Sequence, residues 1–288
     1  MSDWVITVAG ALLVAAALRE VFHTLLHPSG AGQLTPAIFR GMWRAVSPAG
    51  ARGAALAGPL AVVSTILAWT FMVIVGWALV IWPHMPDGFQ VSTGLPASAQ
   101  DDLLDAIYVS ATALSTLGFG DIVAVQAPLR IALVVEALVG FGLLTASISW
   151  VLSIYPALTR GRTLAARINA LVSGDGDEAR LVRGYPDEVL ALVLHDVSDR
   201  LDTTRVDFVQ HPFSYFFAAP SPDLSLPPAI RRLQRAIARH DLPPQARTAA
   251  SAVSGSLHAL GDTLGRGSFG LRGEDAQAVL RAYAADRP

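Results

Sequence analysis

Three long apolar stretches mark the N-terminal half of the chain. Pro59–Trp82 contains no charged residue, Ile131–Tyr155 contains only Glu136, and Val5–Leu26 has its few ionisable residues near its end. A helix rises about 1.5 Å per residue, so roughly 20 residues cross the hydrocarbon core of a bilayer. The pattern predicts three membrane-spanning helices. A cleaved signal peptide is an alternative for the first stretch, but the acidic Asp3 and the lack of arginine before the apolar run argue against it.

A shorter helix and a glycine-rich segment lie between the second and third spans, in Asp101–Asp121 (DDLLDAIYVSATALSTLGFGD). The aspartates at its start can cap a helix and place negative charge in its first turn. Leu103–Leu114 then makes about three turns, roughly 18 Å, and ends halfway through the bilayer. Residues 115–121 must return as extended chain. Backbone at that depth is tolerated only where protein buries it or where it lines a polar cavity.

The alternating glycines of this segment suggest what such a strand does. Gly118 and Gly120 can adopt positive φ, so successive carbonyl groups can turn to one side instead of alternating. Thr116 adds a hydroxyl oxygen at the lower end. Four such strands around an axis form oxygen cages that replace the hydration shell of a potassium ion. The preceding helix points its partially negative C-terminus at the cavity below.

The order of span, half-helix, TLGFGD and span resembles the pore module of the tetrameric potassium-channel superfamily, over about Pro59–Tyr155. The GFGLLTA segment at 140–146 also resembles the inner helix of simple bacterial potassium channels. The resemblance implies an all-α membrane protein. Its pore module would consist of a transmembrane helix, a pore helix with a selectivity-filter loop, and a second transmembrane helix. An N-terminal span and a helical cytoplasmic domain complete the expected fold.

Carried over position by position, the resemblance assigns roles to individual residues. The ion-binding filter would be formed by Thr116, Leu117, Gly118, Phe119 and Gly120. Asp121 would brace the outer mouth, and Gly140 or Gly142 would be the hinge of the inner helix. The potassium ions in the filter are the only bound species implied, and no cofactor is expected.

Three positions depart from the family pattern. Phe119 replaces the more usual tyrosine, and Leu117 is bulkier than the usual valine or isoleucine. The pore helix has Tyr108-Val109 where many relatives carry a pair of tryptophans, so aromatic packing around the filter is thinner. Phenylalanine occurs in members of the family, so we expect potassium selectivity, with a non-selective cation channel as the alternative.

Glu136 is the only acidic residue inside the third span, four residues before Gly140. A carboxyl group inside a membrane is costly and is normally paired or functional. On the face of Gly140 it could reach the back of the pore helix and bond Thr112 or Ser115. It would then be either a structural link between helices or a group that influences gating at the filter.

Glu20, His23 and His27 follow one stripe of the first predicted helix. Two histidines four residues apart, with a carboxylate one turn before them, have spacing that suits a metal ion. Histidines near a membrane surface also bond backbone or lipid headgroups, and no fourth ligand is evident. A metal site is therefore one hypothesis for this stripe, and ordinary hydrogen bonding is the other.

The two parts of the chain differ in their content of charged residues, which the average composition does not show. The chain is 52% hydrophobic and 15% charged, with a net charge of −2. Residues 1–157 hold five arginines and eight acidic residues, whereas residues 158–288 hold sixteen and fifteen. The first part has the composition of a membrane domain and the second that of a soluble one. The net charge argues against a nucleic-acid partner.

Two residue types are missing from the sequence. There is no cysteine, which excludes disulfides, thiolate metal sites and cysteine nucleophiles. All 21 basic residues are arginine, which excludes Walker A ATPases, ordinary protein kinases and Schiff-base enzymes. We expect a protein that is not an enzyme. A membrane metal enzyme that uses the Glu20, His23 and His27 stripe stays as an alternative.

Arginine placement predicts the orientation in the membrane. Arginines follow the first and third spans, at Arg40, Arg44, Arg52, Arg160, Arg162 and Arg167. By the positive-inside rule these stretches are cytoplasmic, so the N-terminus and residues 83–127 lie outside. Within residues 34–57, the apolar residues beside Arg40 and Arg44 predict an interfacial helix, with a plain loop as the alternative.

Residues 158–288 have the periodicity of amphipathic helices. Apolar residues recur at helical spacing over 189–201, and further helices are expected to start at Pro227 and Pro244. The aromatic stretch His211–Phe217 is expected to be the core or a docking surface of this domain. We predict an N-terminal helix and interfacial segment at 1–57, a pore module at 58–157 and a cytoplasmic domain at 158–288. An unknown ligand or protein could bind the last of these.

These expectations combine into one functional hypothesis. One filter loop cannot surround an ion, so the mechanism requires a homotetramer in the lipid bilayer. It would conduct potassium passively as a multi-pass protein of the cell membrane, with the N-terminus outside and the C-terminus in the cytoplasm. A membrane-anchored sensor or scaffold with a degenerate pore is the alternative from another class.

Overall fold

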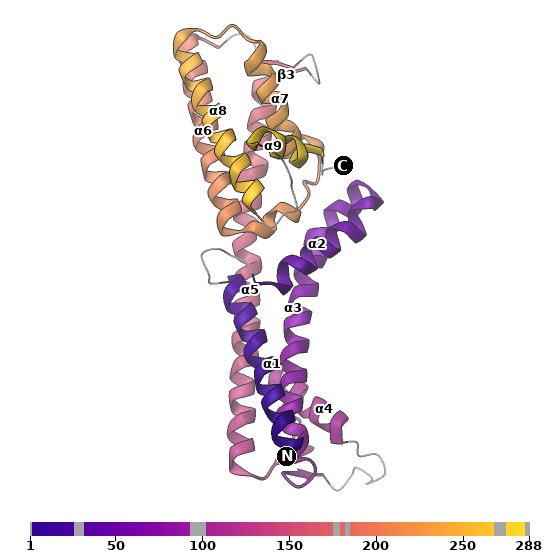
Figure 1. Cartoon of the computed structure of the whole chain (residues 1–288). Helices are drawn as coiled ribbons and strands as arrows, with labels where there is room; N and C mark the ends of the chain where they lie inside the picture. Colours follow the sequence, from indigo (N-terminus) through magenta and orange to yellow (C-terminus); the bar gives the residue numbers. More distant parts are fainter. Residues whose placement is uncertain are drawn as a thin grey trace. The chain divides into compact units, whose positions relative to one another are not determined.

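The computed structural model describes residues 2–25, 32–92, 102–174, 179–181, 185–267 and 275–285. Within them the chain is an all-α membrane protein, and three helices are long and apolar enough to cross a bilayer. The α-helices are α1 Ser2–Leu25, α2 Leu34–Val46, α3 Ala51–Ile81, α4 Asp102–Leu114, α5 Ala127–Leu171, α6 Asp187–Gln210, α7 Leu226–Arg239, α8 Pro244–Arg266 and α9 Ala276–Ala285 (Figure 1). Two short antiparallel ribbons pair β1 Phe89–Val91 with β2 Ile122–Ala124 and β3 Val172–Ser173 with β4 Arg180–Leu181.

The three predicted spans are confirmed as α1, α3 and α5, but two of these helices are longer than their apolar stretches. Helix α3 begins at Ala51, so Pro59 lies inside it, and α5 continues to Leu171, well past Tyr155. Hydropathy reports where a helix contacts lipid, whereas the helix itself continues for as long as its backbone bonds and packing continue. Large apolar side chains such as Phe71 and Leu138, both 66% exposed, cover the outer faces of the spans.

The chain divides into two compact units. The first unit comprises Met1–His27, Gly32–Leu34 and Val63–Val151, and the second comprises Pro28–Ala31, Thr35–Val62 and Leu152–Pro288. The boundaries that composition suggested, after residues 57 and 157, fall inside the continuous helices α3 and α5.

In the first unit, α1 packs against α3 where two glycines meet. A Cβ atom on Gly10 would lie 2.5 Å from the carbonyl oxygen of Gly76, so the two backbones approach too closely for any side chain there. Small residues allow this kind of packing between membrane helices. Helix α3 also contacts α5 through Trp69 and Trp150, whose ring centroids are 5.4 Å apart.

One end of the first unit is held by a small core between α3, α4, the β1–β2 ribbon and the start of α5. Its buried members are Ala78, Ile81, Phe89, Ala106, Val109, Ala124 and Leu129. The register pairs Phe89 with Ala124 and Val91 with Ile122. Sequence analysis did not predict this ribbon, which fixes the chain immediately after residues 115–121.

The second unit is built on two long helices, α6 and α8, which lie side by side, with α9 packed against α8 (Figure 1). Its fully buried leucines include Leu194, Leu201, Leu233, Leu257 and Leu260, each at most 2% exposed. The predicted helix starts are confirmed, because α7 begins at Leu226 and α8 at Pro244.

Helix α2 corrects one expectation about the second unit. The segment is helical, as predicted, but protein covers its apolar face. Phe39 is fully buried, with its ring 4.7 Å from that of Phe213 and 5.5 Å from that of Phe216, and Trp43 also contacts Phe216. The aromatic stretch His211–Phe217 therefore belongs to the core, as expected. An amphipathic pattern alone does not distinguish a face covered by lipid from one covered by aromatic side chains.

Candidate functional site

Helix α4, Asp102–Leu114, has the predicted length and position. Asp102 and Asp105 lie in its first turn, where negative charge favours the helix. Its buried face consists of Ala106, Val109, Ser110 and Leu114. The helix ends at Leu114, and the filter segment starts directly after it.

The first amide groups of the filter segment turn back onto the end of α4. Thr116 N–H donates to the carbonyl oxygen of Ala113 at 2.9 Å. Leu117 and Gly118 N–H both donate to the carbonyl oxygen of Thr112, at 2.9 and 3.3 Å. These bonds use the N–H groups at the beginning of the strand, next to the end of α4.

The backbone of the strand alternates as the glycine pattern predicted. Gly118 and Gly120 have φ angles of 51° and 80°, and Thr116, which is not a glycine, has φ of 60°. Every second residue is therefore left-handed, a conformation that turns neighbouring carbonyl groups toward one side. Among the described residues, none donates a hydrogen bond to the carbonyl oxygens of residues 116–120. The strand thus presents a row of carbonyl oxygens that accept no hydrogen bond from the described residues.

Hydrogen bonds at Asp121 hold the end of the strand that lies farther from α4 in sequence. Tyr108 on α4 donates its hydroxyl hydrogen to Asp121 Oδ2 at 2.7 Å. The carbonyl oxygen of Asp121 accepts the N–H of Ser92 at 2.8 Å, directly beside the β1–β2 ribbon. Two residues expected to support the filter, Tyr108 and Asp121, are therefore brought into direct contact.

Glu136 reaches the back of α4 through Ser110. The Ser110 hydroxyl oxygen lies 2.5 Å from Glu136 Oε1 and 3.0 Å from the carbonyl oxygen of Ile74 on α3. The Ser110 hydroxyl can donate to either oxygen, and because it has one proton it donates to one of them at a time. Glu136 is fully buried, and Oε2 has no partner within the described part of the chain. Ser110 thus links three helices behind the filter.

This contact differs from the predicted one, in which Glu136 would bond Thr112 or Ser115. The Thr112 hydroxyl instead donates to the carbonyl oxygen of Val109, and the Ser115 hydroxyl donates to that of Ala111. Helical spacing places Glu136 on the side facing α4. It does not fix how α4 is rotated about its own axis, and that rotation presents Ser110.

The two glycines proposed as hinges have different surroundings. A Cβ atom on Gly140 would overlap the carbonyl oxygen of Leu114 at the end of α4, whereas a Cβ on Gly142 would meet nothing within 4 Å. Gly140 is therefore a point of close approach between α5 and the pore helix. A hinge role for either glycine stays a prediction.

A cavity of about 340 Å³ lies beside the beginning of the filter strand, between α3, α4 and α5. Its lining includes Thr70, Ser115, Thr116 and Phe141. Most of the wall is apolar, with a few hydroxyl groups close to the C-terminal end of α4. In a single chain the cavity therefore borders the beginning of the predicted filter strand, at Ser115 and Thr116.

The predicted metal stripe is described only in part, because His27 lies outside the described residues. Glu20 accepts hydrogen bonds from the N–H groups of Gln33 and Leu34, at 2.9 and 2.8 Å, and so caps the start of α2. His23 packs edge-on against Phe22. Among the described residues, no three His, Asp or Glu side chains are grouped closely enough to hold a metal. Metal binding at this stripe stays a prediction.

Sequence analysis missed two features that support the strand. Ser110 is the only serine in Asp102–Leu114, and that was the available signal for its link to Glu136. The β1–β2 ribbon has a weaker signal, because each strand has three residues and the two lie far apart in the sequence. β-branched residues at Val91, Ile122 and Val123 are its only local indication.

A protein-family model matches the part of the chain that contains α4 and residues 115–121. Residues 65–155 match the model of a protein family described as "Ion channel". Over 175 residues the chain is 28% identical to the uncharacterized membrane protein YdjJ of Bacillus subtilis (strain 168). That alignment covers 59% of this chain and 50% of the relative, so the chain spans about half the length of the curated relative it matches. No solved structure matches the chain.

Proposed function

Because residues 65–155 match the model of an ion-channel family and three helices are long and apolar enough to cross a membrane, we propose that the chain is the subunit of a potassium-selective channel. The filter would be Thr116-Leu117-Gly118-Phe119-Gly120, and conduction would be passive. The proposal goes beyond the family match in three respects, which are the ion, the assembly and the orientation in the membrane.

The choice of potassium is supported by the backbone conformation of residues 116–120. Thr116, Gly118 and Gly120 all have positive φ, and the strand's amide groups near α4 are bonded back to that helix. This supports a row of carbonyl oxygens that is free to replace the water around a cation. The Tyr108–Asp121 bond holds the outer end of the row in place and supplies part of the support that a tryptophan pair gives in many relatives.

The exposure of the filter strand in a single chain supports an assembly of several copies. Leu117 and Phe119 are 61% and 67% exposed, and added Cβ atoms on Gly118 and Gly120 would meet nothing within 4 Å. Unbonded carbonyl groups do not face lipid, because each would cost several kcal/mol in the hydrocarbon core. Other copies of the chain must therefore cover the strand, and a ring of four gives each ion oxygen ligands on all sides.

Orientation is proposed from the arginines. The N-terminal end of α1 packs near Trp82–His84, at the same end of the first unit as the β1–β2 ribbon (Figure 1). The arginine-rich stretches lie at the other ends of the spans. We place the filter mouth and the N-terminus outside and the C-terminus in the cytoplasm.

The test is potassium flux through the full-length protein in liposomes, together with its mass in detergent. Gly118→Asp should abolish flux, because it places a side chain and a charge at a left-handed filter position. Gly41→Asp is the matched control. Gly41 is exposed on α2, an added Cβ there meets nothing within 4 Å, and flux should continue.

Each outcome separates the alternatives. Flux of potassium but not sodium from a tetramer supports the proposal. Equal flux of both ions indicates the non-selective cation channel instead. A dimer without flux indicates the membrane-anchored sensor or scaffold, and refutes the channel proposal.

A further inference from the structure

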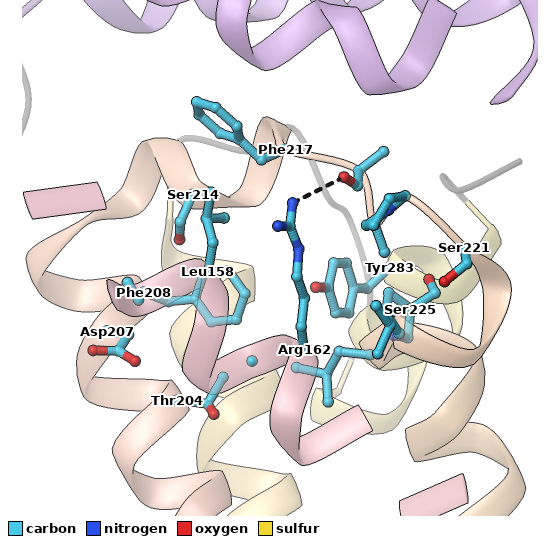
Figure 2. Close-up of a pocket in the computed structure, with 18 of the residues that line it drawn as sticks. Leu158, Arg162, Thr204, Asp207, Phe208, Ser214, Phe217, Ser221, Ser225 and Tyr283 are labelled. Atoms are coloured by element: carbon cyan, nitrogen blue, oxygen red, sulfur yellow. Dashed lines mark hydrogen bonds between the residues drawn. The ribbon is translucent and has the colours of Figure 1, made fainter. Parts of the chain in front are cut away.

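The second unit contains a cavity with an arginine at its centre. The cavity has a volume of about 140 Å³ and is lined by residues from α5, α6, the start of α7 and α9. In Figure 2, Arg162 rises through the middle of it, with Phe208 and Ser214 on one side and Ser221 and Ser225 on the other. The cavity lies within residues 152–288 and is separate from the filter.

The guanidinium group of Arg162 has little to bind in the protein itself. Among the described residues its hydrogen bond goes to the carbonyl oxygen of Ala218, at 3.5 Å, which is the weak end of the range. Within the described residues no carboxylate pairs with it. A guanidinium carries five N–H donors, so most of them remain available to a molecule in the cavity.

The only acidic residue in the lining does not neutralise this charge. Asp207 is already held by Arg160, whose Nε and Nη2 donate to its two carboxylate oxygens at 2.8 and 2.5 Å. That carboxylate is 7% exposed and engaged at both oxygens. The described lining therefore keeps one net positive charge, at Arg162.

The other lining residues indicate which kind of molecule would fit beside the charge of Arg162. Leu158, Phe208, Leu226 and Tyr283 supply apolar and aromatic surface. Cavities of about 150 Å³ in other proteins hold one benzene molecule, so the space suits an apolar body of about that size. A site of this kind, largely apolar with one placed charge, is typical of small-molecule recognition.

From these observations we propose that the cavity binds a small organic anion, with its oxyanion paired to Arg162 and its apolar body against Phe208 and Tyr283, whose rings contact each other edge to face. Arginine pairs well with both carboxylate and phosphate, because its fork matches two oxygens at once. Such a group belongs either to a free metabolite or to an anionic lipid headgroup. The proposal does not depend on ion conduction.

The experiment measures binding to the full-length protein in nanodiscs of phosphatidylcholine by isothermal titration calorimetry. The probes are benzoate and inorganic phosphate, with benzyl alcohol as the neutral analogue of benzoate. We expect at least one anion to bind and benzyl alcohol to bind about 10- to 100-fold more weakly than benzoate. Arg162→Gln should weaken anion binding by a similar factor, whereas the exposed Arg231→Gln on α7 should not.

A second pair of variants tests the cavity without removing the charge. Gly161 lines the cavity and Gly255 lies exposed on α8, and an added Cβ on either meets nothing within 4 Å. Gly161→Leu should fill the cavity and abolish binding in a folded protein, and Gly255→Leu should bind like the unmodified chain.

Nanodiscs that also contain phosphatidylglycerol distinguish the two sources of the anion. Competition by this lipid identifies a headgroup as the ligand, and unchanged affinity identifies a free anion. The proposal is overturned if neither anion binds in either membrane, or if Arg162→Gln and Gly161→Leu bind as well as their controls.

Discussion

Two glycines of α5 allow the packing of the pore helix to be tested by the same substitution at two positions. Gly140→Ala would place a methyl group on the carbonyl oxygen of Leu114, whereas Gly142→Ala would place one in open space. Both lie in the interior of the same helix, so any difference between them reports the contact with α4.

The expected change in the free energy of unfolding has two contributions of opposite sign. Alanine favours a helix interior over glycine by about 0.5–1 kcal/mol, so Gly142→Ala should be slightly more stable than the unmodified protein. Overpacking usually costs about 1–3 kcal/mol. At Gly140 the obstacle is backbone that cannot rotate away, so the upper end applies and the net loss should be about 2 kcal/mol. The two variants should therefore differ by about 3 kcal/mol.

The assay is reversible unfolding of each full-length protein by titration with a denaturing detergent, followed by circular dichroism and paired with ion flux in liposomes. Gly140→Ala should unfold earlier and should also lose flux, because α5 must move away from the end of the pore helix. Equal stability of the two variants would refute the packing argument. Normal stability with lost flux would instead indicate that Gly140 acts as a hinge.

Three further predictions concern groups around the filter and in the second unit. Tyr108→Phe removes the donor to Asp121 and should lower the ratio of potassium to sodium flux; an unchanged ratio would show that the bond does not support the filter. Glu136→Ala leaves Ser110 without its partner on α5 and should cost about 1–3 kcal/mol in detergent unfolding, whereas Glu136→Gln keeps an oxygen that can accept from Ser110 and should cost clearly less. Burial lowers the pKa of His211 below its ordinary value of 6.5, so the fold favours the neutral ring. Stability of the second unit should then fall as the pH drops below about 6.5, and His211→Gln should flatten that dependence in thermal melts at pH 5 to 8.

The parts of the fold that sequence predicted are those set by local chemistry. The apolar runs predicted α1, α3 and α5, and the spacing of Gly118 and Gly120 predicted the positive φ angles that the strand adopts. Prolines predicted the starts of α7 and α8, since a proline is tolerated in the first turn of a helix. Each of these depends on residues within a few positions of one another.

The parts that sequence did not predict depend on contacts between distant segments. The partner of Glu136 is Ser110 rather than Thr112 or Ser115, because packing of α3 against α4 sets the rotation of the pore helix. The apolar face of α2 meets aromatic rings from Pro212–Phe216 rather than lipid. Within the described lining of the cavity, the carboxylate of Asp207 pairs with Arg160 rather than with Arg162, and no local pattern reports that choice.

Helix α5 has a mechanical consequence. Its 45 residues form one continuous helix, and Pro156 lies inside it. A proline removes one backbone donor and crowds the preceding turn, which makes this position the natural bending point of the helix. Ala157, Leu158 and Arg162 follow within two turns, and all three line the cavity of the second unit. A change of angle at Pro156 would therefore begin directly beside the residues that form that cavity.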